Sequence, residues 1–503
     1  MADTQYDICI IGGGINGTGI ARDAAGRGLK VLLLEQGDLA QATSSNSTKL
    51  IHGGLRYLEF YEFSLVREAL KERAKLLKIA PHIIWPLRFI LPHHKDIRPL
   101  WMIRAGLFLY DALAGKSQLQ RSKFLRLDKG EYGAPLKENF KKGFSYADCW
   151  VQDARLVVLN AMDARDRGAD ILTQTKCLSL KEEYDSWNIK AFDKKSGREK
   201  EFSAAMVVNA AGPWVENLLQ GNDFYSEDKE IPHIKLVKGS HIIVPRQYVG
   251  DHAYILQQKD GRIVFSIPYE EEFTLIGTTD VPYDGDPLAT KISDAEINYL
   301  CNAVNSFFKA AITPEDVKST YSGVRALFDD GEEEARAVTR DYKLYSHETA
   351  APMISIFGGK ITTYRHLAED SLAIINKALG KNSKGWSADE CLPGGDIAGG
   401  DVQQYYKGCS QKYPWMPEKM LRRFIVHYGT RLEKIIGPSD GLTDLGTHYG
   451  ADVYEAEIDY VIAQEFVSSA EDFLWRRTKL GLHTDEQTQD KIERAIAAKT
   501  GSK

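Results

Sequence analysis

The first 35 residues combine two apolar runs with a glycine-rich turn between them. Residues 6–11 and 30–34 are short apolar runs, which are typical of buried strands. Residues 15–27 have helical character, with small or apolar side chains at positions 20, 21, 24 and 25. The pattern therefore predicts strand, helix and strand, a βαβ unit of about 30 residues.

Further along the chain, the character of the apolar runs changes twice. A buried strand is predicted at residues 205–209 and another at 352–357, where it meets Gly358 and Gly359. Between them lie short β-rich runs separated by Gly, Asp and Pro, which predict antiparallel strands at residues 240–245, 253–257, 262–268 and 273–278. From about residue 400 the chain is helical and charged, with few β signals.

The 503 residues are too many for one hydrophobic core, so several domains are expected. The fold class is α/β, with a doubly wound, Rossmann-like dinucleotide-binding domain, a β-rich substrate domain and a helical C-terminal domain. We place the dinucleotide-binding domain at residues 1–80, 150–235 and 345–390. The substrate or cap domain takes residues 81–149 and 236–344, and the C-terminal domain takes residues 391–503.

Composition narrows the function classes. The net charge of −6 and pI near 6.1 give no support for nucleic-acid binding, which favours a basic surface. The six cysteines form no C-x-x-C pair, so we expect reduced thiols and no metal site. No segment resembles a signal peptide and no run of about 18 apolar residues occurs, so we expect a cytosolic or membrane-surface protein.

The spacing Gly12-x-Gly14-x-x-Gly17 follows the first strand and opens the helix. In a dinucleotide fingerprint the first glycine permits the turn, the second admits a pyrophosphate, and the third lets helix and strand pack closely. The helix N-terminus offers N–H groups to phosphates. Glu35, at the end of the second strand, is placed to accept hydrogen bonds from ribose hydroxyls. Ile15 and Asn16 complete the set of cofactor contacts in the turn.

The fingerprint alone does not separate FAD from NAD, but the segment after the second strand favours FAD. An NAD domain normally continues there with a helix, whereas residues 42–57 are dense in hydroxyls and glycine. Such a loop is able to donate to a second phosphate and to the polar edge of a flavin; a solvated Ser/Thr loop is the alternative. The candidates are Thr43, Ser44, Ser45, Ser47, Lys49, Leu50, His52, Gly53 and Gly54.

Several stretches together resemble one family. They are residues 10–17, 49–59, 146–155, 209–214, 238–241, 276–280, 321–325, 357–365 and 473–481, the last containing Trp-Arg-Arg-Thr-Lys. They resemble the FAD-dependent, membrane-associated glycerol-3-phosphate dehydrogenases of aerobic bacteria, within the D-amino-acid-oxidase-like flavoproteins. The resemblance covers nearly the whole chain.

The resemblance implies FAD as cofactor and oxidation of sn-glycerol 3-phosphate to dihydroxyacetone phosphate, with electrons passed to quinone. It also implies a homodimer, docked peripherally on the inner face of the cell membrane. Trp85, Trp101, Phe108, Leu109 and Tyr110 lie among arginines and suit an interface, although an ordinary packed helix explains them equally.

The resemblance also assigns a substrate site. A dianionic phosphate requires fixed cations, and the guanidinium fork of arginine suits it. By analogy Arg325 and Arg340 would clamp the phosphate, with Arg56 and Tyr57 near the substrate. Ala326 departs from the family, in which proline often follows the Val-Arg pair.

Lys360 follows a predicted strand, where α/β folds hold ligands, and an ammonium there would stabilise charge on the flavin or orient the substrate. His241 is the candidate base because its ordinary pKa suits proton removal near neutrality; Lys360 or a water remains an alternative, as does a structural role for His241. The remaining candidate flavin contacts are Ala211, Gly212, Trp214, Gly358, Gly359 and Thr362.

Three other functions remain open at this point. An amine or amino-acid oxidase is disfavoured by the several candidate phosphate-binding arginines. An oxidase that uses oxygen directly is not distinguished by sequence. A flavin-binding sensor without turnover would not need His241, Lys360 and the arginines together.

Overall fold

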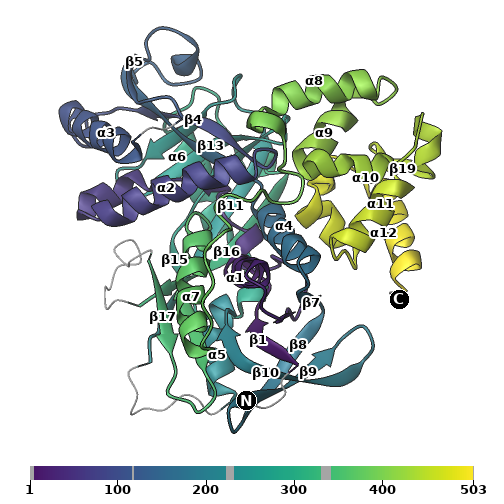
Figure 1. The fold of residues 1–503 in the computed structure, drawn as a ribbon. Helices are drawn as coiled ribbons and strands as arrows, with labels where there is room; N and C mark the ends of the chain where they lie inside the picture. Colours follow the sequence, from purple (N-terminus) through teal and green to yellow (C-terminus); the bar gives the residue numbers. More distant parts are fainter. Residues whose placement is uncertain (1–4, 116–117, 223–230, 330–340, 502–503) are drawn as a thin grey trace.

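The computed structural model describes residues 5–115, 118–222, 231–329 and 341–501, apart from the side chains of residues 56, 59 and 60. It contains two large β-sheets with helices packed on them, and a helical C-terminal domain beside them (Figure 1). The α/β class predicted from the sequence is confirmed.

The first sheet has the strand order β17-β18-β10-β1-β2-β7. Neighbours from β18 to β7 are parallel, and β17 is antiparallel to β18. The bounds are β1 Tyr6–Ile11, β2 Val31–Leu34, β7 Asp170–Leu172, β10 Arg198–Asn209, β17 Tyr342–Ser346 and β18 Met353–Gly358. A hairpin of β8 (Thr175–Glu183) and β9 (Ser186–Asp193) extends it by pairing with β10. Strand β2, and β1 apart from Asp7, are apolar because helices and other strands cover both of their faces.

Helices α1 (Ile15–Gly26), α4 (Asp153–Asp166) and α7 (Tyr364–Ala378) cover one face of this sheet, and the short α5 (Val215–Gln220) packs on the other. Alternate residues of the strands separate these two cores. Ile8 and Ile10 pack with α1, whereas Cys9 and Ile11 pack with α5. This is the doubly wound arrangement that the βαβ pattern predicts.

The second sheet is mainly antiparallel and runs in the order β15-β11-β14-β13-β12-β4-β6-β3, with β16 on β11 and β5 on β6. The bounds are β3 Leu50–Ile51, β4 Ile84–Pro92, β5 Lys123–Arg126, β6 Lys142–Val151, β11 Ile234–Pro245, β12 Ala253–Gln257, β13 Ile263–Tyr269, β14 Phe273–Gly277, β15 Val281–Pro282 and β16 Ser319–Phe328. The antiparallel strands expected between residues 240 and 278 are confirmed.

Helices also cover both faces of the second sheet. Ile242 and Val244 pack with α6 (Asp294–Asn305), whereas Ile243 packs with α2 (Phe63–Ile79) and α3 (Leu100–Ala114). The period of two along β11 therefore sorts its side chains between two cores. Strand β3 falls in the segment that we assigned to the dinucleotide-binding domain, but it pairs with β6 of the second sheet.

The C-terminal domain has its own hydrophobic core and lies to one side of the two sheets (Figure 1). Its helices are α8 Val402–Lys412, α9 Glu418–Tyr428, α10 Leu432–Ile436, α11 Glu455–Gln464 and α12 Glu486–Thr500. It also contains the small hairpin β19 (His448–Gly450) and β20 (Val453–Tyr454) and one π-helical segment, Asp472–Arg477. The predicted helical character of this region is confirmed.

Buried ion pairs connect helices that are far apart in sequence. The Arg365 guanidinium at the start of α7 donates to Glu72 of α2 at 2.6 and 2.7 Å, and both side chains are 2% exposed. Because α7 covers the first sheet and α2 the second, this pair joins the two layers. None of the described helices is both long and apolar enough to cross a bilayer.

Arg365→Met leaves the buried Glu72 carboxylate with the partly exposed Lys75 as its remaining ion-pair partner among the described residues, so we expect the free energy of unfolding to fall by about 3 kcal/mol. The measurement is urea unfolding followed by circular dichroism. Lys412→Met is the matched control, because the Lys412–Glu433 pair is 55% and 52% exposed, and solvent screens such a pair, so its loss should change stability far less. Equal effects of the two substitutions would contradict the prediction.

Candidate active site

A cavity of about 710 Å³ lies between the two sheets. Its walls come from the carboxyl ends of β1, β2, β10 and β18 in the first sheet, and from β11 and β16 in the second. The carboxyl ends of parallel strands meet at one edge, which is where open α/β sheets bind ligands. Such a volume suits a large cofactor together with a small substrate.

The glycine-rich turn forms the floor of one end. Gly12 has φ +115°, and a Cβ there would overlap the carbonyl oxygen of Ala210; a Cβ on Gly17 would overlap the carbonyl of Gly12. Gly17 therefore does not line the cavity but lets α1 start close to β1, as the fingerprint predicts. At Gly14 the nearest neighbour of a Cβ would be Ser44 Oγ, 3.3 Å away, so backbone is open to the cavity.

Glu35 lies at the end of β2 and lines the same end of the cavity. Its carboxylate accepts hydrogen bonds from the Gly13 N–H at 2.6 Å and the Gly37 N–H at 2.8 Å. Burial raises the pKa of the carboxyl, and these two N–H groups act against that rise. Each oxygen keeps a second lone pair, so Glu35 is able to accept from a ribose hydroxyl while it holds the turn.

The hydroxyl-rich loop contributes Thr43, Ser44 and Ser47 to the cavity wall. The Ser44 Oγ accepts from the Ile15 N–H at 3.0 Å, and the Thr43 hydroxyl donates to the Val324 carbonyl at 2.6 Å. The loop thereby contacts both the start of α1 and strand β16.

The position of the Lys49 side chain differs from the prediction that it contacts the cofactor. Its side chain is 1% exposed and its ammonium donates to both carboxylate oxygens of Asp153 at 2.9 Å and to the Ser45 carbonyl at 3.0 Å. The structure therefore turns the Lys49 ammonium away from the cavity, where a phosphate contact was expected. Sequence gave no sign of this, because Asp153 is 104 residues distant. Ser45, Gly53 and Gly54 also lie outside the lining residues, and the Gly53 N–H donates to the Tyr110 hydroxyl at 2.9 Å.

The predicted substrate and catalytic residues His241, Arg325, Lys360 and Tyr57 also line the cavity. The antiparallel register explains the first two. On β11 and β16, position 241 faces Tyr321 and position 237 faces Arg325, so His241 and Arg325 lie on one face of the ribbon. The glycine pair between them, Gly239 opposite Gly323, leaves room on that face.

Two neighbouring side chains orient the Arg325 guanidinium. Its guanidinium forms an ion pair with Asp280 and donates to the Thr278 hydroxyl at 3.1 Å. The side chain is 27% exposed and lines the cavity. Five N–H donors belong to a guanidinium, so donors remain for an anion in the cavity.

Lys360 lies after β18, and its ammonium is 4.3 Å from the centre of the Tyr57 ring. Asn16 donates to the Gly358 carbonyl at 3.2 Å, and its own buried Oδ1 has no hydrogen-bond partner among the described residues. Thr362 is buried, and its hydroxyl accepts from the His52 N–H at 3.4 Å. These residues and the expected contacts Leu50, His52, Ala211, Gly212, Trp214, Gly358 and Gly359 all line the cavity.

Two predicted substrate residues are not placed. Arg340 lies outside the described residues, as does the side chain of Arg56. Their assignment to the substrate stays a prediction.

His241 is 1% exposed and stacks on Tyr321 with ring centres 4.6 Å apart. Its Nε2 is 3.0 Å from the Thr48 hydroxyl, and its Nδ1 has no partner among the described residues. Burial, then the nearby Arg325 and Lys49 cations, hold the pKa of the imidazole well below its ordinary value. His241 is therefore neutral near pH 7 and able to accept a proton.

Sequence reasoning missed several residues of the wall. Thr48 contacts His241, and residues 175–178 at the start of β8 line the end near Glu35. Asn46, Asn217, Asn222 and Asp286 are further polar wall residues. Thr48 and Asn46 were detectable because they stand within the hydroxyl-rich loop, whereas the others belong to no fingerprint.

Comparison with known proteins identifies the chemistry of this cavity. A family model described as FAD dependent oxidoreductase matches residues 7–365, and one described as the C-terminal domain of alpha-glycerophosphate oxidase matches residues 387–500. Among curated proteins, D-erythritol 1-phosphate dehydrogenase of Brucella abortus (strain 2308) is 47% identical over 97% of each chain. The aerobic glycerol-3-phosphate dehydrogenase of Escherichia coli (strain K12) is 47% identical over 98% of each chain.

A solved structure is also similar to this chain over its full length. The glycerol-3-phosphate dehydrogenase from Bacillus halodurans, complexed with FAD, is 28% identical and superposes with a TM-score of 0.79. The alignment covers 100% of this chain and 92% of that chain. The cofactor is FAD, and the residues of the cavity fit it: the Gly14 backbone open to a pyrophosphate, the Glu35 carboxylate, and the orphaned Oδ1 of Asn16.

We expect the His241 imidazole to remain neutral well below pH 6.5, since burial and two nearby cations oppose its protonation. The measurement is an NMR titration of ¹³C-labelled histidines across about pH 8 to 5, with the signal assigned by its loss in His241→Gln. His366 is the internal reference, because its contact with Glu369 raises the pKa of its imidazole. A midpoint near pH 6.5 for His241 would contradict the prediction.

Proposed function

The chain belongs to the FAD-dependent oxidoreductase family, and on that premise we propose that it oxidises sn-glycerol 3-phosphate to dihydroxyacetone phosphate. The observation that carries the proposal is that Arg325, His241 and Lys360 line the same cavity as the glycine-rich turn and Glu35. Together they offer an anion site, a neutral base and a second cation, which are the groups that oxidation of a phosphorylated alcohol requires.

Each residue has one part in the reaction. Arg325, oriented by Asp280 and Thr278, binds the phosphate and so fixes the carbinol relative to the base. His241 takes the hydroxyl proton, because it is neutral and its Nδ1 has no other partner among the described residues. Lys360 stabilises the negative charge that develops as the proton leaves. When bound in this cavity, FAD would supply the acceptor for the carbinol hydrogen, which would leave as a hydride.

A second substrate is favoured by one specific observation, since a curated D-erythritol 1-phosphate dehydrogenase matches this chain at the same 47% identity as the glycerol-3-phosphate enzyme. Both substrates carry a phosphate and a secondary alcohol, so the same three residues serve either. The phosphate contact therefore supports a phosphorylated polyol as the substrate class, and glycerol 3-phosphate is our first candidate within it.

The electron acceptor in this proposal is a membrane quinone, and the working assembly is a homodimer at the inner face of the cell membrane. Support for the membrane face comes from α3 and β5, which are joined by hydrogen bonds from Ser122 to Asp111. Their exposed apolar residues are Trp101 (70%), Met102 (41%), Phe108 (69%) and Phe124 (48%). Exposed cations surround them, namely Lys95, Arg98, Arg104, Arg121, Lys123, Arg126 and Lys129.

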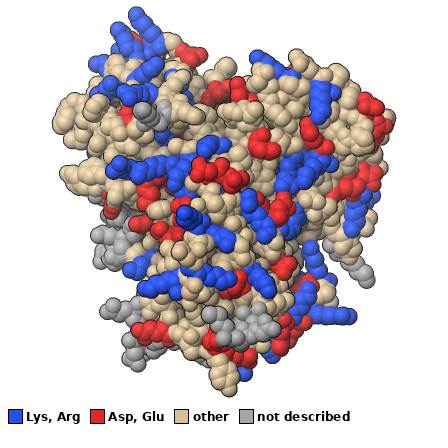
Figure 2. All heavy atoms as spheres, in the orientation of Figure 1, with Lys and Arg blue, Asp and Glu red and all other residues tan. Residues whose placement is uncertain are grey.

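Figure 2 shows Lys and Arg gathered at the upper left, the end of the molecule where Figure 1 labels β5. Apolar side chains enter the headgroup boundary while cations meet anionic lipids, so this composition suits one leaflet. Tyr110 of the expected interface residues is instead buried, where its hydroxyl bonds the Asp148 carboxylate at 2.8 Å.

The proposed reaction is tested by anaerobic bleaching of the flavin absorbance. We expect rapid bleaching with glycerol 3-phosphate and none with glycerol or D-alanine, and D-erythritol 1-phosphate tests the second substrate. Arg325→Met should raise the half-saturating substrate concentration about 10- to 100-fold, the worth of one charged hydrogen bond. Arg262→Met is the control, because Arg262 pairs with Asp260 in a hairpin turn. Bleaching by D-alanine alone would support an amine oxidase instead.

The membrane face is tested with the holoenzyme and vesicles. We expect the protein to bind vesicles that contain anionic lipid. Binding should fall about tenfold or more in Trp101→Ser/Phe108→Ser, because this variant loses the two exposed rings that would enter the lipid. Tyr184→Ser/Val249→Ser is the matched control, since those side chains are 95% and 93% exposed elsewhere. Unchanged binding by the α3 variant would rule out this face.

A further inference from the structure

The loop after β2 is a continuous wall of the FAD cavity. Its residues Glu35, Gln36, Ala40, Gln41, Ala42, Thr43, Ser44, Asn46, Ser47 and Thr48 all line the cavity. Asp38 lies within this run but does not line the cavity, and it is 2% exposed. A buried carboxylate in a binding loop requires partners, because an unpaired buried charge is costly.

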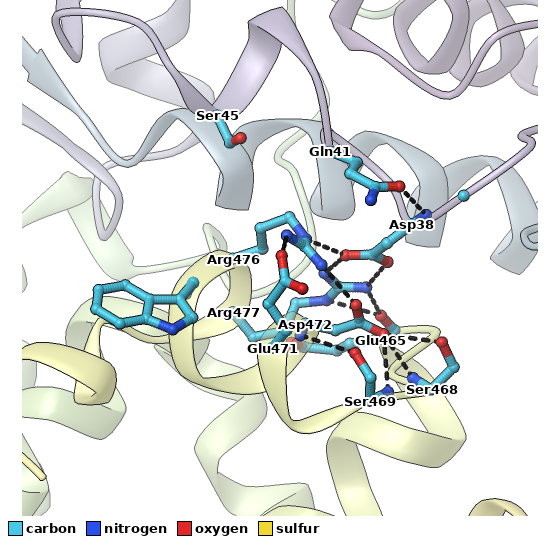
Figure 3. A network of polar contacts seen from close by, with 12 residues as sticks. Asp38, Gln41, Ser45, Glu465, Ser468, Ser469, Glu471, Asp472, Arg476 and Arg477 are labelled. Atoms are coloured by element: carbon cyan, nitrogen blue, oxygen red, sulfur yellow. Dashed lines mark hydrogen bonds and ion pairs between the residues drawn. The ribbon is translucent and has the colours of Figure 1, made fainter. Parts of the chain in front are cut away.

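The partners come from the far end of the chain. Arg477 donates to both oxygens of Asp38, from Nη1 and Nη2, each at 2.7 Å, and Arg476 donates from Nε at 2.6 Å (Figure 3). Arg477 is 0% exposed. The bidentate geometry fixes the position and the orientation of the carboxylate together.

The two arginines are themselves held within the C-terminal domain. Arg477 donates to the Glu465 carbonyl at 2.7 and 2.9 Å, and Arg476 donates to Asp472 at 2.6 Å. Asp472 in turn accepts from the Ser468 and Ser469 N–H groups at 2.8 and 2.9 Å. The arginines end a π-helical segment, a rare form that is frequent at functional sites.

On the cavity side, the same turn is bonded to the cofactor fingerprint. The Gly37 N–H donates to Glu35, and the Ala40 N–H donates to the Gly13 carbonyl at 3.2 Å. The Asp38 N–H donates to Gln41 Oε1 at 3.1 Å (Figure 3). Displacement of Asp38 therefore moves the residues on either side of it that face the pyrophosphate and ribose.

Two further contacts of the C-terminal domain, both among the described residues, attach it to α4. The Arg155 guanidinium pairs with Glu465, and Arg165 donates to the Gln464 carbonyl at 3.0 Å, but both arginines lie on α4, none of whose residues lines the cavity. The domain is thus attached to α4 independently of Asp38. Attachment of the C-terminal domain therefore does not by itself require the bidentate ion pair between Arg477 and Asp38.

We propose that Arg476 and Arg477 are positioning residues for the cofactor: through Asp38, the C-terminal domain holds the loop of residues 35–48 in the conformation that binds the adenosine diphosphate half of FAD. The inference rests on FAD as cofactor and on no choice of substrate. It assigns to the Arg-Arg pair of the Trp-Arg-Arg-Thr-Lys stretch a role in cofactor retention.

The test is FAD affinity. Apoprotein of the full-length chain is titrated with FAD and followed by quenching of flavin fluorescence. Arg477→Lys keeps the charge but loses the bidentate grip, so we expect the Kd for FAD to rise about tenfold or more, with faster hydrogen exchange in residues 36–48. Arg477→Lys combined with Asp38→Asn should weaken FAD binding no further than the stronger single change, because both break one contact.

Arg423→Lys is the matched control. Arg423 also makes a buried bidentate pair, with Glu457, but both residues lie inside the C-terminal domain. We expect a lower Tm for this variant and an unchanged Kd for FAD. An equal loss of FAD affinity in Arg423→Lys would reduce the effect to domain stability and overturn the proposal.

Folded Arg477→Lys protein with wild-type FAD affinity and wild-type exchange in residues 36–48 would also overturn it. Should Arg477→Lys fail to fold, Asp38→Asn replaces it with the same expected outcomes. Flavin bleaching by glycerol 3-phosphate is scored separately on protein saturated with FAD, so failure of the proposed reaction leaves this test intact.

Discussion

Everything in the site follows from the parallel pairing of β18, β10, β1 and β2 in one sheet. Parallel pairing puts four carboxyl ends at a single edge, and the chain leaves that edge through Gly12, Ala210, Glu35 and Gly358. The overlap that any Cβ on Gly12 would make with the Ala210 carbonyl shows how closely two of these exits approach. This edge therefore offers a cofactor mainly backbone and the Glu35 carboxylate, since side chains on the glycine-rich turn would overlap their neighbours.

The second sheet adds a titratable and a charged side chain to the cavity. An antiparallel ribbon projects alternate side chains to one face, so β11 and β16 present His241 and Arg325 to the cavity while their other residues pack in the core. The glycines opposite one another at 239 and 323 make room for the Arg325 guanidinium and for Asn46 of the cofactor loop. Redox chemistry and substrate recognition thus come from different sheets, and the cavity between them is where they meet.

The features that the sequence predicted correctly are those that residues close together in the chain determine. The βαβ unit, the antiparallel strands and the helical C-terminal region depend on periodicity and glycine spacing, and the structure has them. Lys49 was not predictable in the same way, because its direction is set by Asp153, which the fold brings to it. The Arg-Arg pair was visible as a motif, but its partner Asp38 lies 439 residues from Arg477, and no spacing rule connects them. Thr48 was overlooked within a loop whose other hydroxyls were considered.

Because Asp38 and Arg477 lie far apart along the chain, the two residues are synthesised at different times. A ribosome adding about 5–20 residues per second completes the first βαβ unit tens of seconds before it reaches Arg477. During that interval the nascent loop carries a carboxylate whose native partners have not been made. Synthesis of the segment that carries Arg476 and Arg477 therefore sets the moment at which Asp38 gains its partners, and a nascent chain stalled before that segment lacks them.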